Sequence, residues 1–302
     1  MKTELDQRST TEHTASATPG GGNGHPPRLL TSREHRPEAT CVDIDGVRVG
    51  PAEVVVMAGP CSVESAEQVM RIAGEVRAAG ATVLRGGAFK PRTSPYDFQG
   101  LGKTGLEYLR AASAGTGLKV VTEVMDPRDV ELVADYAHCL QIGSRNMQNY
   151  GLLNEVGKLS TPVLLKRGLS ASYREFLLAA EYIMAQGNEQ VILCERGIRG
   201  LTNELRFTLD LSAVPYLKER THLPVMVDPS HGTGSAALVP AMSLAAIACG
   251  ADGLLVETHY APGESISDAP QTISTAVFAQ LMHELGTVAA AIGRSMCPPL
   301  PA

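Results

Sequence analysis

The stretch Val191-Ile192-Leu193-Cys194-Glu195-Arg196 joins an apolar run directly to a carboxylate and a guanidinium. Eight times along the chain, a short apolar run leads to a polar or catalytically competent residue. The eight apolar runs are Val54–Ala58, Thr82–Leu84, Lys119–Thr122, Leu140–Gly143, Pro162–Leu165, Val191–Cys194, Pro224–Val227 and Gly253–Val256. Short continuous apolar runs of this kind are typical of parallel strands that are buried on both faces.

Helical segments separate these runs, with apolar residues recurring every three or four positions. The predicted helices are Ala66–Ala79, Leu106–Ala114, Asp129–Tyr136, Asn149–Val156, Tyr173–Ala185, Leu211–Lys218, Val239–Ala248 and Thr275–Ala291. Eight strand–helix repeats with short connections predict a (β/α)8 TIM barrel, an α/β fold, over residues 53–292. An open doubly wound sheet is the alternative, although no GxGxxG follows the first strand and its crevice would not use all eight strand ends.

The two ends of the chain differ from the barrel in composition. Residues 1–40 are rich in Thr, Ser, Gly, Pro and charge without apolar periodicity, so we expect a disordered N-terminal segment. Residues 41–52 alternate around Asp45-Gly46, which predicts a short hairpin that caps the bottom of the barrel. We expect residues 293–302, which are rich in proline, to form a flexible tail.

The bulk composition narrows the class of protein. A net charge of −6 over 302 residues disfavours a nucleic-acid-binding protein, although a few cations in a cleft suffice to bind an anionic substrate. The six cysteines form no CxxC pair, which favours a reducing, cytoplasmic setting. No apolar run reaches the length of a membrane span, and the N-terminus lacks the apolar core of a secretion signal.

Cations at the ends of several strands predict an anion-binding cavity, because the strand C-termini of a barrel converge on one site. One loop, residues 85–95, contains Arg85, Lys90 and Arg92 among glycines, hydroxyl residues and prolines. Other strand ends add Arg145, Lys166 and Arg196. A solvated basic loop and structural ion pairs are the alternatives. We favour a bound anion because Arg85 directly ends an apolar strand, where an unpaired cation is costly.

A second group of residues has the chemistry of a metal site. The group follows the first, seventh and eighth strands and comprises Cys61, His231, Glu257 and Asp268. A thiolate, an imidazole and carboxylates suit manganese, iron, cobalt or zinc. Each also has a structural alternative: a packed core thiol, a turn cap, the partner of a strand-end arginine and a helix cap. Glu123 and Asp228 are further strand-end carboxylates, for which ion pairing is the alternative to a contact with water or sugar hydroxyls.

Longer motifs resemble the 3-deoxy-7-phosphoheptulonate (DAHP) synthases, in particular their type I β branch. The motifs are AGPCSVES at Ala58–Ser65, then Gly86–Gly102, Thr122–Ala137, Gln141–Asn149, Leu164–Gly168, Ile192–Arg199, Thr208–Pro215, Val227–Gly234, Ser267-Asp268 and Pro270-Gln271. The resemblance implies an enzyme that condenses phosphoenolpyruvate with erythrose 4-phosphate and water. The products would be 3-deoxy-D-arabino-heptulosonate 7-phosphate and phosphate, in the first step of the shikimate pathway of aromatic amino acid biosynthesis.

The resemblance also implies roles for single residues. A divalent metal ion, manganese before iron, cobalt or zinc, would be bound by Cys61, His231, Glu257 and Asp268. Phosphoenolpyruvate would contact Arg85, Lys90, Ser144, Arg145, Lys166 and Arg196, and erythrose 4-phosphate would contact Lys90, Pro91, Arg92 and Thr93. Glu123 would lie near the reacting carbons and Asp228 near the sugar, and the catalytic set would be Lys90, Glu123, Cys61 and His231. No cofactor besides the metal ion is implied.

Three features bear on the choice of aldose. Residues Lys90–Thr93 read KPRT, where the related 3-deoxy-octulosonate 8-phosphate synthases carry Lys-Ala-Asn-Arg, and this favours the four-carbon sugar. The loop Glu257–Pro262 departs from the usual Glu-Val-His-Pro-Asn-Pro, and Phe207 stands where asparagine is common. The alternative function is therefore the same aldol-type chemistry on a different aldose phosphate, of octulosonate type or in secondary metabolism. A catalytically inactive barrel is disfavoured because every candidate ligand is present.

Partners and regulation follow from the resemblance alone. We expect a homo-oligomer, either a tetramer or a dimer, with no nucleic-acid or membrane partner. The segment before Glu53 is too short and too polar for a ferredoxin-like or chorismate mutase domain. We therefore expect a bare barrel that is insensitive to aromatic amino acids by that route. A separate chorismate mutase partner is conceivable but has no support in the sequence.

Overall fold

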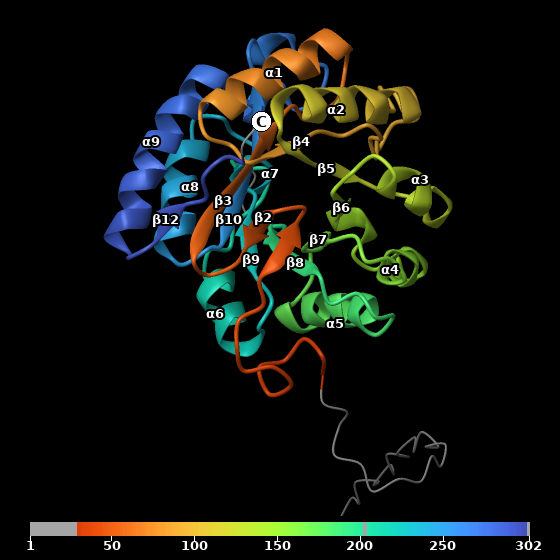
Figure 1. Ribbon diagram of the computed structural model, residues 1–302, viewed down its shortest axis with the longest axis vertical. Helices are drawn as coiled ribbons and strands as arrows, with labels where there is room; N and C mark the ends of the chain where they lie inside the picture. Colours follow the sequence, from red (N-terminus) through yellow and green to blue (C-terminus); the bar gives the residue numbers. More distant parts are fainter. Residues whose placement is uncertain (1–28, 202–203, 301–302) are drawn as a thin grey trace, which may run out of the picture.

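The computed structural model describes residues 29–201 and 204–300, and its centre is a closed barrel of eight parallel strands (Figure 1). The barrel strands are β3 (Glu53–Gly59), β4 (Val83–Arg85), β5 (Lys119–Glu123), β6 (Cys139–Ile142), β7 (Val163–Lys166), β8 (Val191–Glu195), β9 (Val225–Val227) and β10 (Gly253–His259). They pair in chain order, and β10 pairs with β3 to close the ring. The predicted TIM barrel is confirmed.

Helices surround the barrel at the predicted positions. They are α1 (Ala66–Ala78), α2 (Lys103–Thr116), α3 (Val130–Ala134), α4 (Tyr150–Gly157), α5 (Tyr173–Met184), α6 (Ala213–Arg220), α8 (Val239–Ala248) and α9 (Thr275–Ala291). Local capping fixes several starts: Ser172 and Glu175 form a capping box at α5, and the hydroxyl of Ser65 accepts from the backbone of Gln68 at α1. A short extra helix, α7 (Pro229–Thr233), follows β9 and carries His231.

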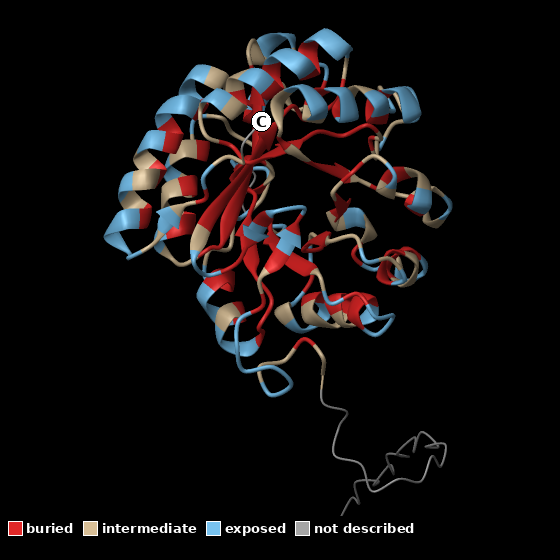
Figure 2. Cartoon of the chain, viewed as in Figure 1, coloured by how far each residue is buried: buried red, intermediate tan, exposed pale blue. Residues whose placement is uncertain are grey.

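Strand alternation divides the apolar side chains into two cores. Along β3, Val54 and Val56 belong to the core between strands and helices, whereas Val55 and Met57 belong to the core inside the barrel. Successive residues of a strand point to opposite faces, so both faces of each strand are apolar. Buried residues accordingly fill the strands, and exposed residues lie on the outer faces of the helices (Figure 2).

The predicted hairpin is confirmed as β1 (Val42–Ile44) paired antiparallel with β2 (Val47–Val49). Asp45 and Gly46 have φ of 48° and 94°, the left-handed geometry that a tight two-residue turn requires. The four apolar side chains of the hairpin are fully buried against the interior core of the barrel. The hairpin therefore closes the barrel at the end opposite the strand C-termini.

Both predicted irregular ends are more ordered than expected. Residues 1–28 lie outside the described residues, but the prediction of disorder is wrong for residues 29–40. The backbone N–H groups of Leu30 and Thr31 donate to the carboxylate of Glu181 at 2.8 and 3.0 Å, and the Thr40 hydroxyl lies 2.6 Å from Nδ1 of His222. These partners are distant in sequence, so composition gave no sign of them.

The prediction of a flexible tail over residues 293–302 is also wrong in part, because Ser295 and Met296 form a strand. Strands β11 (Ile273–Ser274) and β12 (Ser295–Met296) extend the sheet beside β10 and β3, respectively.

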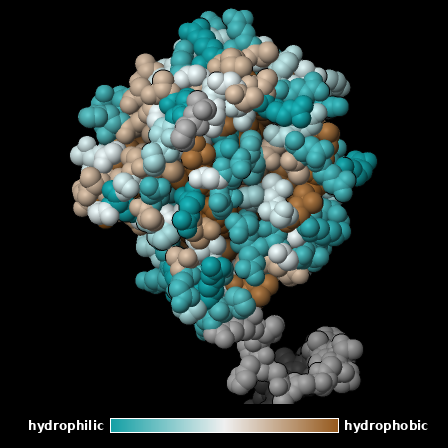
Figure 3. All heavy atoms as spheres, viewed as in Figure 1, coloured by the Kyte–Doolittle hydropathy of each residue, from teal (hydrophilic) through white to brown (hydrophobic). Residues whose placement is uncertain are grey.

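The face seen in Figure 3 mixes hydrophilic and hydrophobic residues without a broad apolar patch. Within the described ranges, no helix combines the length and apolar character needed to cross a membrane.

Candidate active site

A polar cavity of about 260 Å³ lies at the C-terminal ends of the barrel strands. Seven cationic side chains line it: Arg85, Lys90, Arg92, Arg145, Lys166, Arg196 and Arg206. Pro91, Thr93, Glu123, Ser144, His231 and Asp268 are further members of the wall. The structure thus brings the strand-end cations predicted from the sequence into one cavity. Such a density of positive charge is suited to a substrate with several anionic groups.

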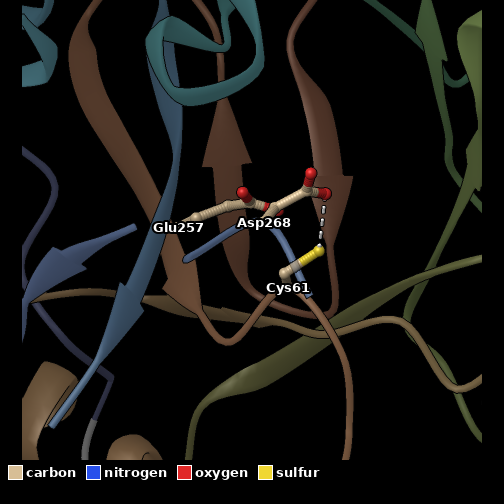
Figure 4. A group of neighbouring side chains, drawn as sticks. All are labelled: Cys61, Glu257 and Asp268. Carbon is tan, nitrogen blue, oxygen red and sulfur yellow. Dashed lines mark hydrogen bonds between the residues drawn. The ribbon is translucent and has the colours of Figure 1, made fainter. Parts of the chain in front are cut away.

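A thiol and two carboxylates meet beside this cavity (Figure 4). One ligand atom from each of Cys61, Glu257 and Asp268 lies within 4.8 Å of the others, and the Cys61 thiol donates to Oδ2 of Asp268 at 3.2 Å. Nε2 of His231 lies 3.4 Å from Oε1 of Glu257, so the imidazole borders the same group. All four predicted metal ligands are therefore neighbours, although they come from three separate strand ends.

Asp268 adopts a backbone conformation that is rare for a residue with a side chain. Its φ of 54° and ψ of 31° are left-handed, and Asp45 in the hairpin turn is the one other non-glycine residue of the described chain with positive φ. Strain of this kind is retained where the surrounding structure requires it, and it concentrates at functional sites. The carboxylate is held toward the Cys61 thiol by this turn.

Neighbouring side chains fix the orientation of each member of the cluster. Glu257 accepts hydrogen bonds from Arg85 at 3.0 Å and from Gln271 at 2.5 Å. Arg206 donates to Asp268 at 3.0 Å. Lys90 places its ammonium 2.9 Å from the sulfur of Cys61. Three of the four candidate ligands therefore have a partner here that sets their direction.

Burial and nearby charge determine the protonation of the cluster. Burial, reinforced by Glu257, raises the pKa of the Cys61 thiol to about 12. Burial opposes ionisation of Asp268 as well, but His231 and Arg206 outweigh it and lower the pKa of that carboxyl to about 2. Around neutral pH the site therefore combines a charged carboxylate with a neutral thiol. A divalent cation would favour loss of the thiol proton, because a coordinating thiol is deprotonated.

The structure places Asp228 differently from the expected contact with the sugar. Its carboxylate is fully buried and does not line the described part of the cavity. It pairs with Lys166 and lies 2.7 Å from Nδ1 of His231. Despite burial, His231 and Lys166 hold the pKa of Asp228 well below its ordinary value. Asp228 therefore orients Lys166 and His231, and it leaves Nε2 of His231 directed toward Glu257.

The opposite side of the cavity is formed by loop residues. Arg145 donates to the carbonyl of Pro91 at 2.8 Å and to Thr93 at 3.3 Å, which joins the loops after β6 and β4. The hydroxyl of Ser144 is buried without a partner among the described residues. Glu123 enters the cavity from the end of β5 and accepts from Gln141 at 3.2 Å. This side offers cations and a hydroxyl to one ligand.

The structure adds supporting residues to which the sequence assigned no role, among them Arg206, Phe207, Ser267 and Gln271. They lie in irregular loops after β8 and β10, where no periodic pattern points to them. The resemblance motifs included Ser267 and Gln271 without indicating a function for either. Their partners are Asp268, Arg196, Arg92 and Glu257, respectively, so each supports a residue that the sequence did predict.

Comparison with known proteins gives one consistent family. A model described as the DAHP synthetase I family matches residues 35–292. A phospho-2-dehydro-3-deoxyheptonate aldolase of Thermotoga maritima is 49% identical over 267 residues, covering 88% of this chain and 79% of its own. A 2-dehydro-3-deoxyphosphooctonate aldolase of Acidithiobacillus ferrooxidans is 30% identical over 233 residues, covering 71% of this chain and 82% of its own.

Solved structures agree with this assignment. The crystal structure of the DAHP synthase of Thermotoga maritima superposes with a TM-score of 0.87 at 48% identity, over 89% of this chain and 79% of that one. A truncated form of 3-deoxy-D-arabino-heptulosonate 7-phosphate synthase from the same organism gives a TM-score of 0.83 at 45% identity, over 88% of this chain and 98% of that one. The chain belongs to the DAHP synthetase I family.

Proposed function

We propose that this protein condenses phosphoenolpyruvate with erythrose 4-phosphate and water to give 3-deoxy-D-arabino-heptulosonate 7-phosphate and inorganic phosphate. The observation that carries the proposal is the cavity itself, in which seven cations adjoin a Cys/His/Glu/Asp cluster at the strand ends of a DAHP synthetase I family barrel. The reaction brings together two phosphates and a carboxylate. A cavity of this charge supplies their counter-ions.

We assign residues of the cavity to each of the two substrates, with Lys90 shared between them. Lys166 and Arg196 lie at the ends of β7 and β8, and we assign to them, with Arg85, Lys90, Ser144 and Arg145, the carboxylate and phosphate of phosphoenolpyruvate. The loop residues Lys90, Pro91, Arg92 and Thr93 are assigned to erythrose 4-phosphate. Holding both reactants in attack geometry removes part of the entropic barrier to a bimolecular reaction.

The proposed reaction joins the two substrates in three changes of bonding. C3 of phosphoenolpyruvate attacks the aldehyde carbon, water adds at C2, and phosphate leaves with cleavage of its bond to C2. Lys90, with its ammonium beside the Cys61 sulfur, is placed to give a proton to the aldehyde oxygen. Glu123 faces the cavity from the end of β5, where its carboxylate is available to orient the water.

We also propose that the activity depends on a divalent metal ion. The thiol, imidazole and two carboxylates form a donor set that fits manganese, iron, cobalt or zinc, and their partners hold them together. When bound, such an ion supplies Lewis-acid polarisation of the aldehyde oxygen. Chelation should abolish phosphate release and added manganese should restore it. Activity that survives thorough chelation would refute the metal dependence while leaving the condensation unaffected.

Other aspects of the proposal rest on the family. We place the reaction at the start of the shikimate pathway and the enzyme in the cytoplasm, in line with six free cysteines in the described residues. We propose a homo-oligomer, a tetramer or a dimer. Size measurement by light scattering tests the oligomer, and a monomer at enzyme concentrations used in assays would contradict it.

A second candidate is the octulosonate-type reaction on arabinose 5-phosphate. It is favoured by the 30% identity to 2-dehydro-3-deoxyphosphooctonate aldolases and by the unusual loop Glu257–Pro262. The deciding experiment measures phosphate release from phosphoenolpyruvate with each aldose at equal concentration, in the presence of manganese. We expect a larger kcat/KM with erythrose 4-phosphate. A preference for arabinose 5-phosphate would overturn the first proposal in favour of the second.

A further inference from the structure

Arg196 is held differently from three other cations of the cavity. Arg85 pairs with Glu257, Lys166 with Asp228 and Arg206 with Asp268. Arg196 is 5% exposed, and within the described residues it makes no ion pair. Its one hydrogen bond runs to the carbonyl of the adjacent Gly197 at 3.4 Å. A buried guanidinium without a carboxylate needs another source of stabilisation.

One such source is the ring of Phe207. The guanidinium carbon of Arg196 lies 4.2 Å from the centre of this ring, and that of Arg206 lies 5.6 Å away. The negative face of an aromatic ring attracts a cation, and the attraction is strongest where water is excluded. Stacking also leaves the N–H groups at the edge of the guanidinium free, whereas a carboxylate partner would occupy them.

The backbone fixes Phe207 in this position. Ile198 and Thr208 form a two-way antiparallel bridge, with N–H to O distances of 3.0 and 2.9 Å. The bridge brings Gly197 beside Phe207, so closely that a Cβ on Gly197 would lie 2.8 Å from the Cβ of Phe207. Gly197 also has φ of 88°, and its N–H donates to Glu195 at 2.6 Å. The ring is therefore a built part of the cavity wall.

We propose that Phe207 is a positioning residue that keeps the Arg196 guanidinium oriented, with its N–H donors free to bind an anionic group of the substrate. This inference rests on the proposed function for the identity of that substrate. Burial lowers the pKa of Arg196, and the charge of Asp228 opposes that shift.

The test uses substitutions that separate the ring face from the bulk of the side chain. Phe207→Leu keeps an apolar side chain without a π face, and Phe207→Tyr keeps the face. Tyr136→Leu is the matched control, because Tyr136 stacks on Arg110 at 4.3 Å and neither residue lines the cavity. Dissociation constants for phosphoenolpyruvate and for inorganic phosphate are measured by calorimetry on the manganese-loaded proteins, alongside KM and kcat.

We expect Phe207→Leu to raise the Kd for both anions by about 10- to 30-fold, with Phe207→Tyr and the control within about threefold of wild type. The KM for phosphoenolpyruvate should rise more than kcat falls, and the melting temperature should stay unchanged. Equal anion affinity in Phe207→Leu and wild type would overturn the inference. Wild-type protein that binds phosphate but not phosphoenolpyruvate would refute the proposed function, and the phosphate data would still decide the inference.

Discussion

Replacement of Gly143 by alanine should displace a carboxylate of the cavity without unfolding the barrel. Gly143 has φ of −68° and ψ of 157°, which alanine adopts without strain. A Cβ at this position would lie 2.0 Å from Oε1 of Glu123, whereas ordinary contact begins at 3.4 Å. The difference, 3.4 minus 2.0, means that the carboxylate must move by about 1.4 Å. It would then leave its hydrogen bond with Gln141.

The expected result is a loss of activity that is much larger than the loss of stability. The atom that moves is the free end of a side chain, so the free energy of unfolding should change by less than about 1 kcal/mol. A misplacement of about 1 Å in a catalytic group costs on the order of 100-fold in rate, equivalent to about 2.7 kcal/mol of barrier. We therefore expect kcat/KM for phosphate release to fall roughly 100-fold.

Two variants make this result interpretable. Gly74→Ala lies on α1, where a Cβ meets nothing within 4 Å, and it should leave kcat/KM unchanged. Glu123→Ala removes the carboxylate itself and should match or exceed the loss in Gly143→Ala. Unfolding is followed in urea by circular dichroism for all variants. The reasoning is refuted if Gly143→Ala keeps kcat/KM within threefold of wild type while Glu123→Ala loses activity.

Two further changes test the stability of the barrel, both measured by urea denaturation. Asp228→Asn leaves the ammonium of Lys166 buried without its counter-charge, and should lower the free energy of unfolding by about 3–5 kcal/mol, because one partner of a buried pair is removed. Its control, Glu155→Gln, breaks an exposed pair and should cost less than about 0.5 kcal/mol; equal losses in the two would contradict the argument. Gly253→Ala would place a Cβ 2.2 Å from the carbonyl oxygen of Val55. This oxygen belongs to the backbone of the adjacent strand, and moving it would disturb the pairing of the two strands. We expect the free energy of unfolding to fall by about 3 kcal/mol. A urea unfolding midpoint equal to that of the wild type would contradict this, because it would show that the two strands can move apart at little cost.

Strand and helix periodicity was sufficient to predict the barrel. Runs such as Val191–Cys194 are apolar on both faces because each strand contacts both cores, and this leaves a clear pattern in the sequence. The hairpin was predictable because Asp45-Gly46 is a local signal. By contrast, residues 29–40 are held by partners such as Glu181 that lie far along the chain, and a local composition cannot show such contacts.

The candidate site likewise contains residues that the sequence could place and residues that it could not. Residues that directly end a strand, such as Arg85 and Glu257, could be placed at the cavity from topology alone. Asp228 also ends a strand, but whether its carboxylate reaches the cavity depends on Lys166 and His231, which only the packing reveals. Phe207 lies in an irregular loop after β8, and its contact with Arg196 depends on the fold of that loop.

The most direct test of the proposed function is the fate of phosphoenolpyruvate labelled with ¹³C at C3. The label is followed by NMR after incubation with manganese-loaded protein and either erythrose 4-phosphate or arabinose 5-phosphate. We predict that the olefinic carbon becomes the C3 methylene of a seven-carbon 3-deoxy sugar, with one phosphate released for each bond formed. A label that ends in pyruvate, in an eight-carbon sugar, or in unchanged phosphoenolpyruvate would contradict the assignment.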